Sequence, residues 1–247
     1  MKIVPKRCFW IFQRLEFSLK VIDLHKIVFP SVIALLILFQ LSCTHNGREI
    51  EKGEASLRLG DFAMAKRFFE GVLERDPEHY QARLGMGKSL IQEASSRGGD
   101  SLLWSRALTH LEAARSLRPE AHVEPLLSDA WLVQARFILD REDTLNALKA
   151  LSRAIDLNPK AVEALNLAGI IYFRLGEPQK ASTLFEHAMV TDTLNPVTYF
   201  NLGMINWAAN DFRDAHKFWF KALSLAPEDK DILYWYAVVQ KKLEEKE

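Results

Sequence analysis

The sequence lacks most of the features that mark a chemically specialised protein. Its 247 residues include only two cysteines, Cys8 and Cys43, too few for a disulfide framework and without the spacing of a structural zinc site. The 32 basic and 32 acidic side chains cancel, so no net charge attracts nucleic acid. No apolar run reaches the roughly 20 residues of a comfortable transmembrane helix. A hydrophobic share of 49% still indicates an ordinary globular protein.

Catalytic signatures are also missing. The chain has no His-Glu-x-x-His, paired Cys-x-x-Cys or Gly-x-Ser-x-Gly motif, and its seven histidines are scattered. Residues 82–89 (ARLGMGKS) fit a relaxed phosphate-loop pattern in which Lys88 would reach a phosphate. They follow a predicted helix end and turn, whereas a phosphate loop must follow a buried strand. We therefore expect no catalytic residues, cofactor, metal or small-molecule substrate.

An apolar run of fifteen residues, 27–41, ends in Ser42-Cys43. Its length fits the core of a secretory signal peptide, and a small residue before cysteine resembles a bacterial lipoprotein signal, although Gln40 stands where that signal usually has leucine. The resemblance implies that residues 1–42 are a leader, that Cys43 is lipidated, and that 43–45 form a short anchor segment. Two other interpretations remain open: an uncleaved signal anchor and a buried apolar segment.

The leader is unusually long for a signal peptide, because 26 residues precede the apolar run. A start at Leu24 would leave a compact leader, so we expect residues 1–23 to be an over-extended start. Residues 1–42 hold six of the 32 Lys/Arg and two of the 32 Asp/Glu, so the remaining chain has a net charge of −4.

From residue 46 onward the chain repeats itself. The recurring pattern is an alanine, a bulky apolar residue four places later, a small residue three places after that, and then a proline. The period from Ala147 to Ala181 and from Ala181 to Ala215 is 34 residues both times. A period of this length indicates stacked supersecondary units. The apolar spacing inside each copy is helical, and the proline stands where a second helix must end. Each copy is thus predicted to be an antiparallel helix pair.

These copies resemble the tetratricopeptide repeat (TPR) family, which also places a small residue in the middle of each first helix, here Gly53, Gly87, Ala135, Gly169 and Gly203. The resemblance implies an all-α fold, a right-handed α-solenoid of stacked helix-turn-helix repeats. The repeats span 46–229, and a C-terminal capping helix occupies 230–247. The five copies are 46–79, 80–121, 128–161, 162–195 and 196–229.

Departures from the repeat predict local irregularities. The second copy is eight residues too long, and the turn-forming residues Ser95–Asp100 predict an enlarged loop between its helices. Residues 122–127 are extra, which predicts the weakest joint of the array near Pro125. The last helix is predicted to have the polar outer side of a terminal cap.

The resemblance also implies a binding face, the concave side lined by the first helix of each copy. Its early part should be polar and mixed in sign, with Ile50, Glu54, Arg58, Lys88, Gln92, Asp129, Arg136 and Asp140. Its later part should be apolar and aromatic, and we take this part as the candidate protein-binding groove. The alternative is that these later residues belong to the core. The groove residues are Ile170, Phe173, Phe200, Met204, Trp207, Tyr234 and Val238.

The expected function is a non-enzymatic scaffold that binds a protein or peptide and is lipid-anchored in the cell envelope, facing the periplasm or surface. In architecture it resembles pilotins of type IV pilus assembly and the lipoprotein partner of the outer-membrane barrel assembly machine. Residues 50, 54, 84 and 88 do not match the Lys/Asn clamp with which some TPR proteins bind chaperone tails. The alternative function is a cytoplasmic-facing adaptor on an uncleaved anchor, since six Lys/Arg before the apolar run would keep that end inside.

Overall fold

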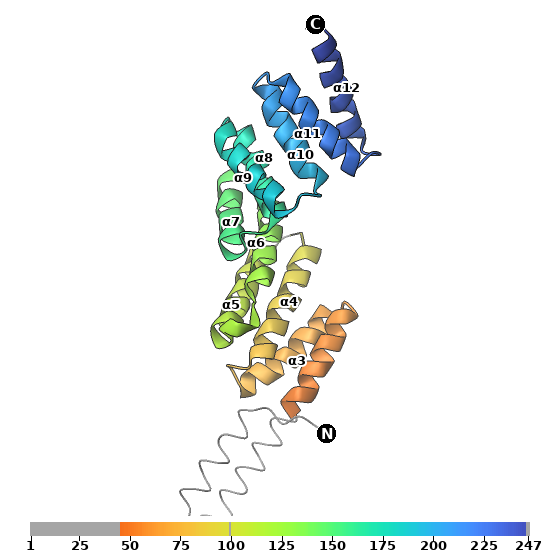
Figure 1. Ribbon diagram of the computed structural model, residues 1–247. Coiled ribbons are helices and arrows are strands. Elements are labelled where there is room, and N and C mark those ends of the chain that lie inside the picture. The colour runs from red at the N-terminus through yellow and green to blue at the C-terminus, as the bar shows by residue number, and fades with distance from the viewer. Residues whose placement is uncertain (1–44, 99, 246–247) are drawn as a thin grey trace, which may run out of the picture. The chain divides into compact units, whose positions relative to one another are not determined.

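The structure, a computed structural model, describes residues 45–98 and 100–245, and all regular structure in these ranges is helical (Figure 1). The predicted leader, Cys43 and residues 246–247 lie outside the described residues. A first helix occupies residues 45–58. It is followed by α3 (Phe62–Arg75), α4 (Tyr80–Ser96), α5 (Ser101–Leu117), the short 3-10 helix η1 (Pro119–Ala121), α6 (Glu124–Leu139), α7 (Thr144–Leu157), α8 (Val162–Arg174), α9 (Pro178–Thr191), α10 (Pro196–Ala208), α11 (Phe212–Leu225) and α12 (Lys230–Glu244).

The chain divides into two compact units, Met1–Glu51 and Lys52–Glu247. In the first unit, the described residues 45–51 are helical and Ile50 is buried.

Most turns inside the helix pairs contain a residue with a positive φ just before the second helix begins. Gly60, Glu142, Gly176 and Asn210 each have a positive φ between 62° and 77°, a conformation that reverses the chain in few residues. In three of these turns the next residue is an aspartate, and its carboxylate accepts a hydrogen bond from the backbone N–H three residues on, as in Asp61 with Met64 at 2.9 Å. Each such aspartate caps the second helix of its pair.

The repeated residues form the core. The bulky member of each copy is at most 1% exposed, and the alanine four places before it is fully buried. The small residue in the first helix lies directly under the bulky side chain. A methyl group added at Gly169 would lie 2.5 Å from the ring of Phe185, so two helices can approach this closely only because glycine is there. The five bulky residues are Phe69, Leu111, Leu151, Phe185 and Trp219.

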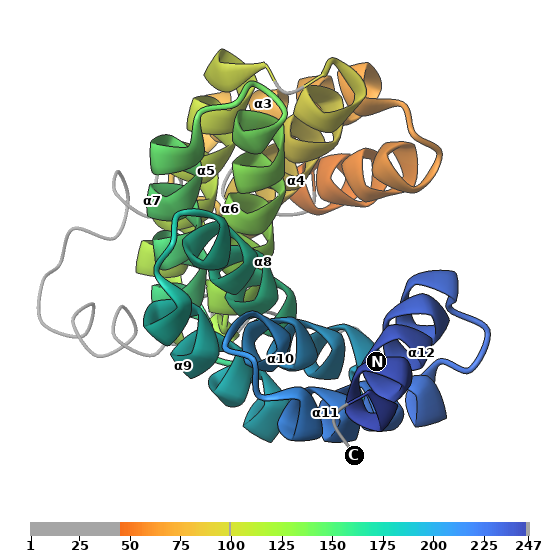
Figure 2. The same cartoon turned by 90° about the horizontal axis from the view of Figure 1, so that it is seen from above.

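Within residues 52–245 the helices form two layers of a curved array. Figure 2 shows α4, α6, α8 and α10 along the inner side of the curve and α5, α7, α9 and α11 along the outer side. Within a pair the helices pack extensively, and each second helix also contacts the first helix of the next pair. The predicted all-α solenoid of helix-turn-helix repeats is therefore confirmed.

The predicted enlarged loop in the second copy is wrong. The helices α4 and α5 are each 17 residues long, whereas α10 has 13 and α11 has 14. The connection is only residues 97–100. The extra residues thus lengthen the helices, because Ala94 is fully buried and keeps α4 in contact with its neighbours almost to its end.

The joint after the second copy contains the short 3-10 helix and His122, whose φ of 50° is left-handed. Pro125 stands in the first turn of α6, where proline is tolerated because its missing N–H has no helical partner. Of the consecutive long helices from α3 to α12, α5 and α6 share the fewest contacts, as the prediction of a weak joint requires.

The terminal helix α12 differs from the predicted polar cap. Its inner side packs on α11 through Ile232, Trp235 and Val239. Its outer side is polar at the start, where Lys230 and Asp231 are exposed, and again in the second half, but Leu233 and Tyr234 between them are 43% and 63% exposed.

Candidate protein-binding face

The inner side of the first copies contains an open cavity of about 730 Å³. Apolar side chains of Leu57, Leu84 and Leu126 form part of its lining, together with the rings of Phe62 and Tyr80. The polar members of the lining are Glu54, Arg58, Gln81, Lys88 and Gln92.

The charged groups of this cavity are available to a ligand. Glu54, Arg58 and Lys88 are all exposed, and none of the three has an ion-pair partner in the part of the chain that the structure describes. Arg58 and Lys88 come from neighbouring first helices, so two cations from different copies line one cavity. Unpaired guanidinium and ammonium groups bind carboxylates well, the guanidinium in a two-pronged geometry.

Further along the inner side, Arg136 is already engaged in an ion pair. Arg136 of α6 forms an ion pair with Glu163 of α8, which links the first helices of two copies. The pKa of Asp129 is raised, first by partial burial and then by the neighbouring charge of Glu163. Asp140 is exposed at the end of α6. This middle region therefore has more carboxylates than free cations.

The aromatic end of the predicted groove is largely packed. Trp207 lies 4.8 Å from Phe212, and 5.8 Å from each of Trp219 and Trp235, between ring centroids. Phe200 and Met204 pack against the same cluster of α11 and α12 residues. All three predicted groove residues of α10 are consequently half-buried.

The other groove residues divide between packing and exposure. Ile170 and Phe173 pack against Ala181, Phe185 and Leu202 and are half-buried. Val238 is half-buried, and Tyr234 is exposed. Phe173 also lines a second cavity of about 510 Å³ with Gly176, Pro178, Gln179, Ser182, Ile205, Ala208 and Ala209.

Sequence reasoning missed the apolar floor of the first cavity. Leu126 lies in the insertion 122–127, where the repeat pattern assigns no direction to a side chain. Leu57 and Leu84 fall at helical positions that serve equally well for packing between helices. Only the folded arrangement brings the three leucines to one cavity.

Residues 82–89, the phosphate-loop-like segment, are helical within α4. Its glycines serve packing, since methyl groups added at Gly85 and Gly87 would lie 2.3 Å from Phe69 and 2.6 Å from Leu111. Backbone amides inside a helix are bonded to carbonyls and cannot cradle a phosphate.

The pKa values of two histidines, His79 at the start of α4 and His110 in α5, are lowered. His79 caps α4 because its Nδ1 accepts a hydrogen bond from Ala82 N at 3.3 Å, and its pKa is lowered mainly by burial. His110 Nδ1 lies 3.3 Å from a guanidinium nitrogen of Arg83. Burial, followed by the charges of Arg83 and Arg106, lowers the pKa of His110 to about 4.

Among the described residues, no group of three or more His, Cys, Asp or Glu side chains is arranged to hold a metal ion. In the same residues no helix combines the length and the apolar character needed to cross a membrane.

Comparisons with known proteins agree with this geometry. Two family models described as tetratricopeptide repeat match residues 50–79 and 132–188. Anaphase-promoting complex subunit 3 of Schizosaccharomyces pombe is 31% identical over 166 residues, which are 63% of this chain but 24% of that protein. The chain therefore spans about a quarter of this relative's length.

Two solved structures share the fold. YrrB, described as a TPR protein with an unusual peptide-binding site, has 19% identity and a TM-score of 0.51, with 75% of this chain and 89% of that chain covered. Pseudomonas aeruginosa PilF has 14% identity and a TM-score of 0.53, with 83% and 87% covered. The chain contains tetratricopeptide repeats, and its described helices share the solenoid fold of these two structures.

Proposed function

We propose that this tetratricopeptide-repeat chain is a non-enzymatic scaffold that binds an extended protein segment along its inner face. The observation that carries the proposal is the open cavity in which unpaired Arg58 and Lys88 share the lining with three leucine side chains. Unpaired charges beside exposed apolar surface are typical of a surface that a partner covers. YrrB supports the proposal, because a solenoid of similar fold is described as having a peptide-binding site.

The lining indicates what kind of segment fits. A carboxylate of the partner would bind between Arg58 and Lys88, and an apolar side chain one or two residues away would bury itself against Leu57, Leu84 and Leu126. We therefore propose a ligand with acidic and apolar residues close together. Phe173 would extend the contact toward the later copies, as the second cavity beside Phe173 suggests.

Charge reversal tests this proposal. The detergent-solubilised full chain, carrying an affinity tag, would be used to capture proteins from native membranes, as wild type and as Arg58→Glu/Lys88→Glu. The wild type should recover a specific partner that the double variant loses. Arg153→Glu, at an exposed position on the outer helix α7, is the matched control and should recover the partner. Equal recovery of the partner by the wild type and the double variant would show that this cavity does not bind the partner.

We further propose that the chain is held in the cell envelope by lipid on Cys43, facing the periplasm or the surface. The support is the apolar run that ends in Ser42-Cys43. One acyl chain binds membranes only marginally, and about 0.8 kcal/mol per buried methylene makes two or three chains a lasting anchor. Labelling cells with a palmitate analogue should mark the wild type but not Cys43→Ser. Equal labelling of both would refute the anchor.

The alternative function is a cytoplasmic-facing adaptor on an uncleaved anchor. It is favoured by the six Lys/Arg that precede the apolar run. Protease added to intact cells or to spheroplasts separates the two functions, because only an outward-facing chain would be digested without breaking the inner membrane.

A further inference from the structure

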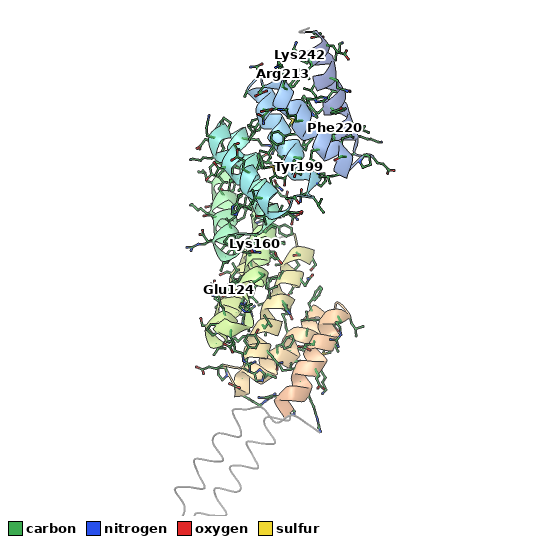
Figure 3. All side chains as sticks on the ribbon, in the orientation of Figure 1. Glu124, Lys160, Tyr199, Arg213, Phe220 and Lys242 are labelled. Atoms are coloured by element: carbon green, nitrogen blue, oxygen red, sulfur yellow. The ribbon has the colours of Figure 1, made fainter. Side chains whose placement is uncertain are left out.

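The terminal helix α12 has one covered and one open side. Its covered side packs on the preceding helices, while Lys230, Leu233, Tyr234, Ala237, Lys241 and Glu244 are all exposed. Three- and four-residue spacings place these six on one stripe along the helix. Phe220 of the neighbouring helix α11 is also 58% exposed, and its ring lies 6.0 Å from that of Tyr236 on α12 (Figure 3).

Ala237 marks where a further helix would pack. It follows Gly203 by 34 residues, as Gly203 follows Gly169. At the two earlier positions a side chain of the next helix covers the small residue, Trp219 over Gly203 and Phe185 over Gly169. Ala237 has the same small size and is exposed, so the stripe is a packing surface that the described chain leaves open.

The charges on the stripe indicate what covers it. Lys230 and Glu244 lie seven residues before and seven residues after Ala237, and neither has an ion-pair partner in the described ranges. If two such helices cross antiparallel with Ala237 against Ala237, each Lys230 meets the other helix's Glu244. Lys241, the third charge on the stripe, lies opposite Leu233 of the other helix in this arrangement, so no like charges face each other. The stripe is thus complementary to itself, as an interface around a two-fold axis requires.

We propose that α12 pairs antiparallel with α12 of a second copy of this chain. Ala237 lies at the crossing, where a small side chain allows the two helices to approach closely. Tyr234 and Leu233 of each copy cover the other copy's helix one turn away, and the Lys230–Glu244 pairs close both ends of a contact about 21 Å long. The proposed peptide-binding face is separate, so one dimer would hold two partner segments.

Charge reversal and restoration test the dimer. The full chain in detergent, studied by sedimentation, should dimerise reversibly. Lys230→Glu and Glu244→Lys should each raise the dimer dissociation constant about tenfold, because both symmetric pairs become repulsive. The double variant should return close to wild type. Lys160→Glu, in the turn between α7 and α8 (Figure 3), is a control that should change nothing.

Cross-linking tests the crossing point. In a variant with Cys8→Ser and Cys43→Ser, Ala237→Cys should form a disulfide between two copies under mild oxidation, because the two Cβ atoms meet at the axis. Leu145→Cys, an exposed position on α7, is the control. A wild-type chain that stays monomeric at tens of micromolar, or a double variant as weak as the single variants, would overturn the proposal and leave the stripe to a different protein.

Discussion

The indole of Trp219 covers Gly203 so closely that a methyl group on Gly203 would lie 2.3 Å from Nε1. The same nitrogen donates a hydrogen bond to the Phe200 carbonyl at 3.0 Å. One contact thus joins the two helices of the fifth copy by packing and by a hydrogen bond.

Gly203→Ala should therefore destabilise the protein by about 1 to 3 kcal/mol, since the indole must move and its hydrogen bond weakens. The matched control is Gly71→Ala in the middle of α3, where an added methyl group meets only Arg75 at 3.8 Å. That change should stabilise the helix by about 0.5 to 1 kcal/mol. Urea unfolding of both variants measures the difference, and equal effects would contradict the packing account.

Trp207 and Tyr234, both predicted groove residues, should behave differently when truncated. Trp207→Ala removes contacts to three rings and should cost about 2 to 3 kcal/mol, somewhat less than a fully buried tryptophan. Tyr234→Ala, at 63% exposure, should change stability by less than about 0.5 kcal/mol. Melting of the two variants checks this, and a Trp207→Ala protein as stable as the wild type would assign Trp207 to the ligand surface instead.

A buried hydrogen bond ties α8 to α10. Asn166 Nδ2 donates to Thr198 Oγ1 at 2.9 Å, and both residues are at most 5% exposed. Thr198→Val keeps the shape but leaves the amide unpaired, which should cost about 1 to 3 kcal/mol. Thr183→Val in α9 removes only an exposed bond to the Gln179 carbonyl and should be nearly neutral. Similar losses of unfolding free energy in both variants would show that the buried hydrogen bond stabilises the protein no more than the exposed one does.

The stability of the second copy should depend on pH through His110. Its pKa is about 4 in the folded protein against an ordinary 6.5, so between these values the unfolded chain takes up a proton that the folded chain does not. Stability from this group is complete above pH 6.5 and is lost as the pH falls toward 4.

His110→Gln should accordingly lose less stability between pH 7.5 and 4.5 than the wild type does, as measured by urea unfolding. His187→Gln, at an exposed position on α9, should keep the wild-type pH dependence. An unchanged pH dependence in His110→Gln would show that His110 is accessible to protons in the folded state.

The sequence predicted the solenoid because the fold is local. Ala181, Phe185 and Ala188 are spaced for one helix, and the same spacing returns with a period of 34, so each unit can be recognised alone. The lengths of α4 and α5 could not be predicted this way. Turn-forming residues such as Ser95 show where a helix could end, but burial of neighbouring side chains decides whether it continues.

The binding face was harder to predict for a related reason. The position of Trp207 in the repeat predicts which side of its helix the side chain is on. It does not predict that the ring of Trp235, 28 residues later in the chain, packs against it. The polar part of the inner face was easier to predict, because long charged side chains such as Arg58 and Lys88 extend from the helices and remain exposed whatever packs beneath them. Leu126, which completes the cavity floor, lies outside the repeat pattern altogether.

The central claim is that a partner segment lies on the inner face of the first copies. Site-specific photo-cross-linking in living cells tests it most directly. A benzophenone amino acid at Gln92, exposed in the cavity lining, should form a discrete adduct with one partner, while the same group at Arg153 on the outer helix α7 should not. Adducts of equal yield at both positions, or an adduct at Arg153 alone, would contradict the account.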